Sequence, residues 1–229
     1  MDMSVLLTEN DFKSYTWQHG MPLLIIGLIG LVLIIYGNRL NKYEKKHQLL
    51  FNISLIPAIT IFIQSMVPVL DGSFSIQDDL PLHICRFVAL VSPIVIWKMN
   101  KFWLGIFYFW ILSGTLNANI TPDIEFGFPH YNYFAYWLSH SFLVILPLYY
   151  VIVFKIRITI KDLNRAFWMA NVFLLFTLTV NILIGSNYMY SRQKPLAASL
   201  LDYMGSWPTY LITGQLLALV LFFILYLPF

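Results

Sequence analysis

Long apolar runs follow one another along almost the whole chain, and each has about the length of a helix that crosses a bilayer. A hydrocarbon core of roughly 30 Å needs about 20 apolar residues per helix. Of the 229 residues 59% are hydrophobic and 11% are charged, whereas an ordinary soluble domain has about 25% charged residues. We therefore predict an all-α polytopic membrane helix bundle of about seven transmembrane helices, which form a single integral membrane domain over residues 1–229. The predicted spans lie near residues 20–36, 49–70, 80–97, 102–119, 133–154, 166–184 and 207–227.

The charges of the loops alternate in sign along the chain. Basic residues gather in the first, third and fifth loops, while most acidic residues lie in the N-terminal segment and in the other loops. Loops that face the cytoplasm carry an excess of lysine and arginine. With seven crossings, this pattern predicts an N-terminus outside and a C-terminus in the cytoplasm. The basic residues are Arg39, Lys42, Lys45, Lys46, Lys98, Lys101, Lys155, Arg157, Lys161 and Arg165.

Composition also argues against several classes of function. The formal net charge of +3 is divided among short loops, whereas nucleic-acid binding needs a basic surface in one place, so no nucleic-acid partner is predicted. The lone Cys85 rules out an internal disulfide and a multi-thiolate metal site. The histidines show no recognised ligand spacing, and we predict neither a metal nor a cofactor. Membrane lipid is the expected partner, and the oligomeric state is left open.

Polar residues within the predicted spans gather in the outward half of the membrane. Because polar side chains are costly in a bilayer, such residues are the first candidates for function. A pore needs polar residues through both halves, so the one-sided distribution instead predicts a pocket open to the outer leaflet. The candidates are His83, Cys85 and Arg86 in the third span, Asn117 in the fourth, His140 in the fifth, Asn187 after the sixth, and His130 at the outer face.

Cys85 and His140 could form a nucleophile and its base. A thiol becomes reactive when it loses its proton, and a nearby histidine can take that proton for acyl transfer through a thioester. Arg86 and His83 are suited to a phosphate or a carboxylate, since the arginine fork matches those groups, and Asn117 and Asn187 are possible oxyanion donors.

Each of these residues also has a plainer interpretation. A lone membrane cysteine is often a small packing residue, and Arg86 can extend its charge to the headgroups. Asn117 and Asn187 could be helix caps. Tyr136 and Trp137 are predicted to belong to an aromatic belt at the membrane interface.

Several longer motifs resemble the YwaF family of bacterial integral membrane proteins, and they cover essentially the whole chain. That resemblance implies a multi-pass protein of the bacterial cytoplasmic membrane. The motifs are residues 80–85, 109–110 with 114–116, 121–123, 126–130, 138–140, 187–190, 194–195, 199–202, 207–208 and 225–229.

More remotely, the chain resembles a eukaryotic multi-span acyltransferase that builds ether phospholipids, and membrane hydrolases of the androgen-induced type. The acyltransferase implies a catalytic cysteine and a later histidine, and Cys85 and His140 match that order. We therefore expect a membrane-embedded lipid acyltransferase or acyl hydrolase. The alternative is a non-catalytic binding protein or transporter that holds a small ligand or lipid in the same pocket.

Overall fold

The protein is described by a computed structural model that covers residues 11–195 and 200–229, so the predicted outer acids Asp2 and Glu9 and the motif residue Ser199 lie outside the described residues. The described parts are helical and contain no strand beyond one isolated bridge between Asp11 and Phe126. The helices are α1 (Trp17–Arg39), α2 (Tyr43–Asp71), α3 (Ile84–Lys98), α4 (Lys101–Trp110), α5 (Leu116–Ile120), α6 (Tyr131–Val153), α7 (Ile160–Ile184) and α8 (Thr209–Tyr226). A π-helix, Ile111–Thr115, joins α4 to α5, and two short 3₁₀ helices cover Tyr188–Tyr190 and Leu200–Tyr203.

Five of these helices, α1, α2, α6, α7 and α8, are long and apolar enough to cross a membrane, as judged over the described residues. The all-helical membrane architecture is therefore confirmed. With 15 residues, α3 is shorter than a usual span, because a helix rises only 1.5 Å per residue. The helical path from Lys101 to Ile120 is continuous but changes its pitch at the π-helix. The count of seven spans and the direction of the termini stay predictions.

Helix α3 begins later than the sequence predicts. The third span is predicted to start near residue 80, and in the structure regular helix begins at Ile84. Pro81 disfavours helical backbone at the residue before it, Leu80. His83 has extended backbone at the N-cap position. His83 therefore does not share a helical face with Arg86. Cys85 lies in the first turn of α3.

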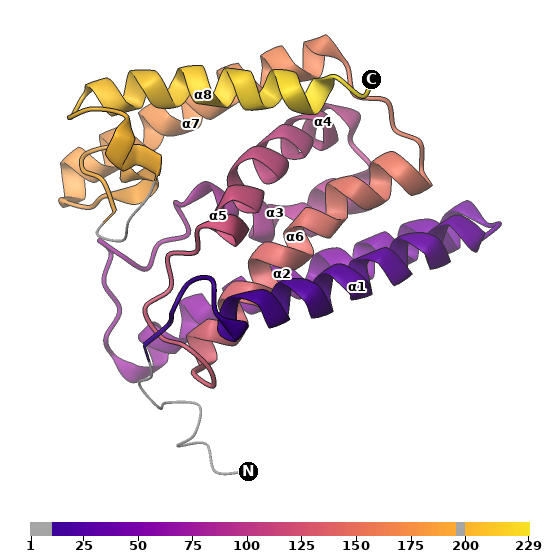
Figure 1. Cartoon of the computed structure of the whole chain (residues 1–229), viewed down its shortest axis with the longest axis horizontal. Coiled ribbons are helices and arrows are strands. Elements are labelled where there is room, and N and C mark those ends of the chain that lie inside the picture. The colour runs from indigo at the N-terminus through magenta and orange to yellow at the C-terminus, as the bar shows by residue number, and fades with distance from the viewer. Residues whose placement is uncertain (1–10, 196–199) are drawn as a thin grey trace.

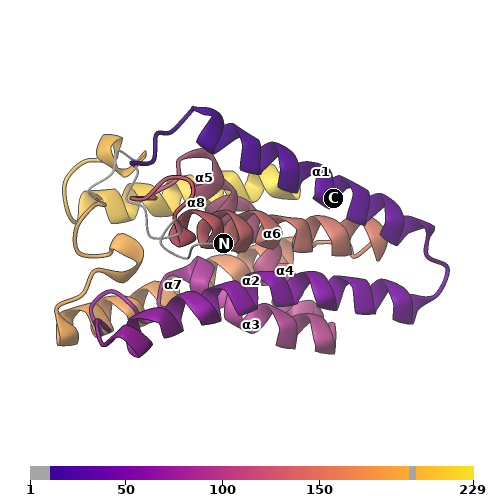
Figure 2. The ribbon, with the colours of Figure 1, turned by 90° about the horizontal axis from the view of Figure 1, so that it is seen from below.

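Helix α6 is the centre of the bundle. In its most apolar stretch 61% of the residues are buried, against 11% in the corresponding stretches of α7 and α8. Helices α1, α2 and α4 pack against α6. Figure 1 shows α1 and α2 on one side of α6, with α7 and α8 together on the other side beyond α4. Figure 2, turned by 90°, again shows α6 running through the middle of the molecule.

Aromatic side chains with polar tips connect the helices through backbone carbonyls. Tyr149 of α6 donates to Lys46 O of α2 at 3.2 Å, and Tyr150 of α6 donates to Leu104 O of α4 at 2.7 Å. Trp110 of α4 donates to Ala166 O of α7 at 2.8 Å. These side chains bury large apolar rings and still satisfy their polar atoms, which is what a low-dielectric interior requires.

The outer helices expose large apolar side chains along their length. Leu28 and Val32 of α1, Leu175 and Leu183 of α7 and Ile212 of α8 are all more than half exposed. Contiguous apolar surface of this extent is unfavourable in water and is matched by lipid acyl chains.

Helices α4 and α7 approach closely where Gly105 faces Asp162. A Cβ atom added to Gly105 would lie 2.7 Å from the Asp162 carboxyl carbon. Asp162 has little room to move, because it accepts hydrogen bonds from the Thr159 amide at 2.9 Å and the Thr159 hydroxyl at 2.6 Å. This capping box begins α7. Only glycine therefore fits at position 105.

We expect Gly105→Ala to lower the free energy of unfolding by about 1–3 kcal/mol, the usual cost of overpacking. Thermal unfolding of the purified protein in detergent measures this change. Gly27→Ala is the matched control, since a Cβ atom there meets nothing within 4 Å. An equal loss of stability in both variants would contradict the close approach of α4 and α7.

Candidate functional site

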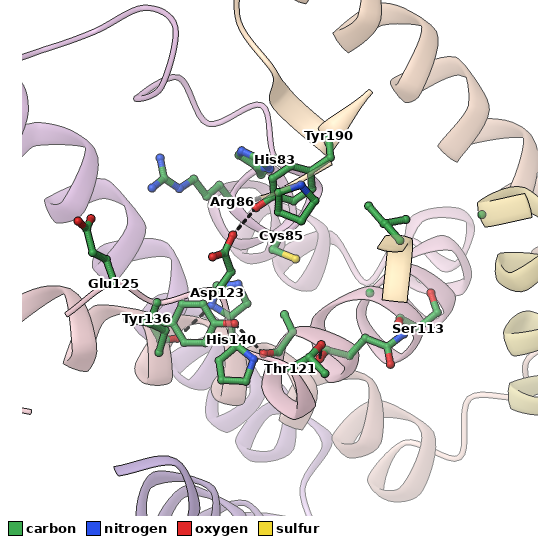
Figure 3. A pocket seen from close by; sticks show the side chains of 18 of the residues that line it. His83, Cys85, Arg86, Ser113, Thr121, Asp123, Glu125, Tyr136, His140 and Tyr190 are labelled. Atoms are coloured by element: carbon green, nitrogen blue, oxygen red, sulfur yellow. Dashed lines mark hydrogen bonds between the residues drawn. The ribbon is translucent and has the colours of Figure 1, made fainter. Parts of the chain in front are cut away.

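A cavity of about 660 Å³ opens beside the first turn of α3. Its walls come from α2, α3, α6, α8, the π-helix with α5, the segment after α5, and the 3₁₀ helix that contains Tyr190. Figure 3 shows the polar side chains that surround it. The polar lining consists of Gln64, His83, Cys85, Arg86, Ser113, Asn117, Thr121, Asp123, Glu125, Asn132, Tyr136, His140 and Tyr190.

One apolar part of the cavity wall comes from α8. Gly214, Leu217, Ala218 and Leu221 line it, and they recur on one face of that helix. The cavity therefore has one wall of polar and charged side chains and another of apolar side chains along one face of α8. This combination suits an amphipathic molecule better than a small polar solute.

Cys85 lies in the first turn of α3 and lines the cavity. Its sulfur accepts a hydrogen bond from the Thr115 hydroxyl at 3.4 Å. Thr115 is the last residue of the π-helix, and single π-turns often mark functional sites. The thiol therefore has one polar partner, the Thr115 hydroxyl.

The His140 ring is held in one orientation. Its Nδ1 lies 3.0 Å from the Tyr136 carbonyl oxygen, and its ring stacks on the Tyr136 ring with centroids 4.1 Å apart. A carbonyl can only accept, so Nδ1 carries the proton and donates it. Ser139 also lies 3.2 Å from Nδ1, and its own hydroxyl donates to Ala135 O. In the neutral ring Nε2 is therefore left with the lone pair that a general base needs.

The structure brings Cys85 and His140, which come from different helices, to the walls of one cavity. Figure 3 shows both side chains together with Tyr136 and Asp123. Among the described residues no hydrogen bond joins the sulfur to the His140 ring, because Thr115 and Tyr136 are their respective partners. A proton would pass between them through substrate, water or a side-chain movement, which is common in the unliganded sites of enzymes.

The charged part of the cavity lies at His83, Arg86, Asp123 and Tyr190. The Tyr190 hydroxyl donates to an Asp123 carboxylate oxygen at 2.7 Å, and the His83 ring packs against Tyr190 with centroids 5.4 Å apart. Burial, followed by the neighbouring Asp123 carboxylate, raises the pKa of Tyr190, so this hydroxyl stays protonated as a donor. Arg86 has no ion-pair partner among the described residues, and its guanidinium is available to an anion.

The other predicted binding residues separate into two groups. Asn117 of α5 lines the cavity, and its amide nitrogen donates to Ser113 O of the preceding π-helix at 2.8 Å. Asn187 is absent from the described cavity lining, because its oxygen accepts from the amides of Arg192 and Gln193 and its nitrogen donates to Gln193 O. It organises a loop.

His130 likewise is not part of the described cavity lining. It begins α6 as its N-cap, where Nδ1 accepts from the Asn132 amide at 3.2 Å, and its ring packs against Phe126 with centroids 4.4 Å apart. Its position therefore serves to start α6 and to hold the segment before it.

The predicted aromatic belt is wrong for two residues. Trp137 is buried, with 2% of its surface exposed, and Tyr136 lines the cavity and donates to Ala118 O at 2.6 Å. Their spacing on an apolar helix is compatible with either location, and only the central position of α6 decides it. Thr115, which donates to the Cys85 sulfur, and Asp123, which lines the cavity, were likewise not among the predicted site residues.

A buried asparagine holds the loop that supports Tyr190. The Asn181 amide nitrogen donates to Tyr188 O and to the Ser191 hydroxyl, each at 2.8 Å. Its oxygen accepts from the Tyr188 amide at 2.9 Å and from the Ser186 hydroxyl. Asn181 is fully buried, so this network is the framework of one wall of the cavity.

Comparison with known proteins places the chain in a family. The family model described as the TMEM164 family matches residues 14–226. The chain belongs to the TMEM164 family. No curated protein and no solved structure matches the chain. The match covers every helix from α1 to α8 and every residue of the described cavity lining, so the cavity belongs to the part that defines a TMEM164 family member. The resemblance to the YwaF family stays a prediction.

We expect Asn181→Ala to destabilise this TMEM164 family member by about 1–3 kcal/mol for each buried polar group that it leaves unsatisfied. A lower midpoint of thermal unfolding in detergent measures the effect. Thr179→Ala is the control, because the exposed Thr179 hydroxyl bonds only to Leu175 O of its own helix. Equal midpoints for the two variants would show that the loop does not depend on Asn181.

Proposed function

We propose that this membrane protein is a lipid acyltransferase or acyl hydrolase that forms a thioester on Cys85. The observation that supports this proposal best is that Cys85 and His140 line one cavity while the Tyr136 carbonyl leaves Nε2 of His140 as the acceptor. A nucleophile, a base and a group that orients the base are the parts that covalent acyl transfer requires.

The first half of the proposed reaction transfers an acyl group to the protein. His140 Nε2 takes the thiol proton, and the Cys85 sulfur attacks the carbonyl carbon of a lipid ester. The tetrahedral intermediate collapses, the ester C–O bond breaks, and His140 returns the proton to the departing alkoxide. The products are a deacylated lipid alcohol and an acyl-Cys85 thioester.

The second half returns the protein to its starting state. An acceptor hydroxyl, from a second lipid or from water, gives its proton to His140 and attacks the thioester. The C–S bond breaks and the sulfur regains the proton. Thr115 donates to the sulfur, and a donor at this position stabilises negative charge as the thiolate forms or leaves. Asn117 is the proposed oxyanion donor.

The two walls of the cavity support an amphipathic substrate. The apolar face of α8 at Leu217 and Leu221 suits an acyl chain, and Arg86 with His83 suits the phosphate of a phospholipid. We place this cavity at the outer leaflet of a bacterial cytoplasmic membrane, with seven spans and the N-terminus outside. The alternation of charge between the loops and the YwaF resemblance support this placement.

We expect Cys85→Ala to abolish covalent acylation and His140→Ala to slow it by about 10²–10⁴-fold, which is the usual contribution of a general base. Purified protein is incubated with phospholipid whose acyl chain is labelled. Protein-bound label is then measured before and after treatment with hydroxylamine, which cleaves thioesters.

His47→Ala is the matched control for the histidine change, since His47 lies in α2 outside the described cavity lining and contacts Ile96 O. Labelling that survives in Cys85→Ala would refute the thioester. If Cys85→Ala were silent but Arg86→Gln abolished lipid binding, the site would instead belong to a binding protein or transporter.

Arg86 provides a separate test of substrate position. We expect Arg86→Gln to raise KM for a phospholipid by about 10- to 100-fold with a smaller change in kcat, since a charge-assisted hydrogen bond contributes about 1.5–3 kcal/mol. The KM of Arg86→Lys is expected to lie between those of the wild type and Arg86→Gln, because lysine keeps the positive charge but lacks the forked donors of the guanidinium. An unchanged KM in Arg86→Gln would place the phosphate elsewhere.

A further inference from the structure

A second cavity, of about 640 Å³, lies at the other end of the helices. The Cys85 cavity adjoins the start of α3 and the end of α5. The second cavity adjoins the start of α4, the end of α6 and the start of α7. The two cavities share no lining residue, so the second one is separate from the proposed catalytic site.

The second cavity is strongly basic. Four cationic side chains line it, Lys101, Lys155, Arg157 and Arg165, against one carboxylate, that of Asp162. All four cationic residues are exposed, and their charges are accessible to a ligand that approaches from the membrane surface. Like charges repel one another, and a bound anion relieves that repulsion.

The single carboxylate is already engaged. Asp162 accepts from Thr159 in the capping box and from Arg165 at 3.3 Å. Arg157 donates to the main-chain oxygen of Phe229 at 3.2 Å. Lys101 and Lys155 have no ion-pair partner within the described parts of the chain. Two ammonium groups therefore face the cavity region without an acid to balance them.

The ends of two helices reinforce this positive charge. The first residue of α4 is Lys101, and α7 begins directly after Thr159, so the N-terminal ends of both helices adjoin the cavity. A helix N-terminus carries about half a positive charge. The cavity thus combines side-chain cations with two helix N-termini. The first amides of α4 bond to Asn100 and the Asp162 amide of α7 bonds to Thr159, so the side-chain cations are the groups that remain for an anion.

Exposed apolar residues directly follow two lining residues of the same cavity in the sequence. Phe102 follows Lys101 and is exposed, and Ile160 follows Thr159 and is 47% exposed. The Arg165 guanidinium lies over the Phe102 ring at 5.3 Å. A cationic cavity with exposed apolar residues beside it matches a molecule that carries an anionic head and apolar chains.

We propose that this second cavity binds the phosphate of an anionic phospholipid headgroup. The basic loops adjoin this end of the bundle, and basic loops face the cytoplasm, where the inner leaflet is anionic. Basic pockets between helices on that side are known to hold anionic headgroups. The site is a lipid-binding site that operates independently of chemistry at Cys85.

The test uses the full-length protein in detergent and phosphatidylglycerol with a fluorescent acyl chain, followed by fluorescence anisotropy. We expect the double variant Lys101→Gln, Lys155→Gln to bind about 30-fold more weakly, which corresponds to the loss of two cations near an anionic lipid. Lys101→Arg with Lys155→Arg keeps both charges and is expected to retain binding. Lys161→Gln is the matched control, because exposed Lys161 is one residue before Asp162 and is not part of the described lining.

Competition identifies the source of the phosphate. Displacement by unlabelled phosphatidylglycerol, and not by phosphatidylcholine or inorganic phosphate, supports the lipid site. Displacement by inorganic phosphate at the same concentration would overturn the lipid assignment in favour of a soluble phosphate. The site itself would be overturned if the double glutamine variant bound the lipid as tightly as the wild type. It would also be overturned if Lys161→Gln lost as much affinity as the double variant. The proposed reaction is tested separately, by labelling of Cys85, so failure of that reaction leaves this binding result unaffected.

Discussion

Backbone groups in a bilayer have no water to bond with, and helices solve this problem by bonding within themselves. The packing of such helices still needs polar side chains to find partners. In this protein α6 provides the common surface, and Tyr149 and Tyr150 donate from it to carbonyls of α2 and α4. The burial of α6 determines the position of His140, since the ring points from this central helix into the cavity.

The two cavities divide the molecule chemically. One end has a thiol, a histidine with a fixed tautomer, and a wall of α8 that fits an acyl chain. The other end has cations in excess and two helix N-termini. The two proposals are compatible, because an anionic lipid bound at one end can fix the depth of the bundle in the membrane while the other end holds the proposed substrate.

The candidate site could be predicted in part. Cys85, Arg86 and His140 stand out because polar residues are rare in apolar runs, and all three line the cavity. Asn187 has the same appearance in the sequence, but its amide bonds to its own loop. Tyr136 looks like an interfacial residue and instead orients His140. These differences depend on which neighbours each residue meets, and a single sequence carries little information about such contacts.

The length and composition of the apolar runs determined that this chain is a helical membrane protein, because the hydrocarbon thickness and the need to satisfy backbone groups allow few other structures. Pro81 restricted the backbone of Leu80 before α3, which begins at Ile84. The tertiary structure alone decided that α6 is central, that a π-turn brings Thr115 to the Cys85 sulfur, and that Lys101 meets Lys155 at one cavity. The physical reason is that lipid makes the outer faces of the helices nearly equivalent, so packing shape and a few buried hydrogen bonds select the arrangement.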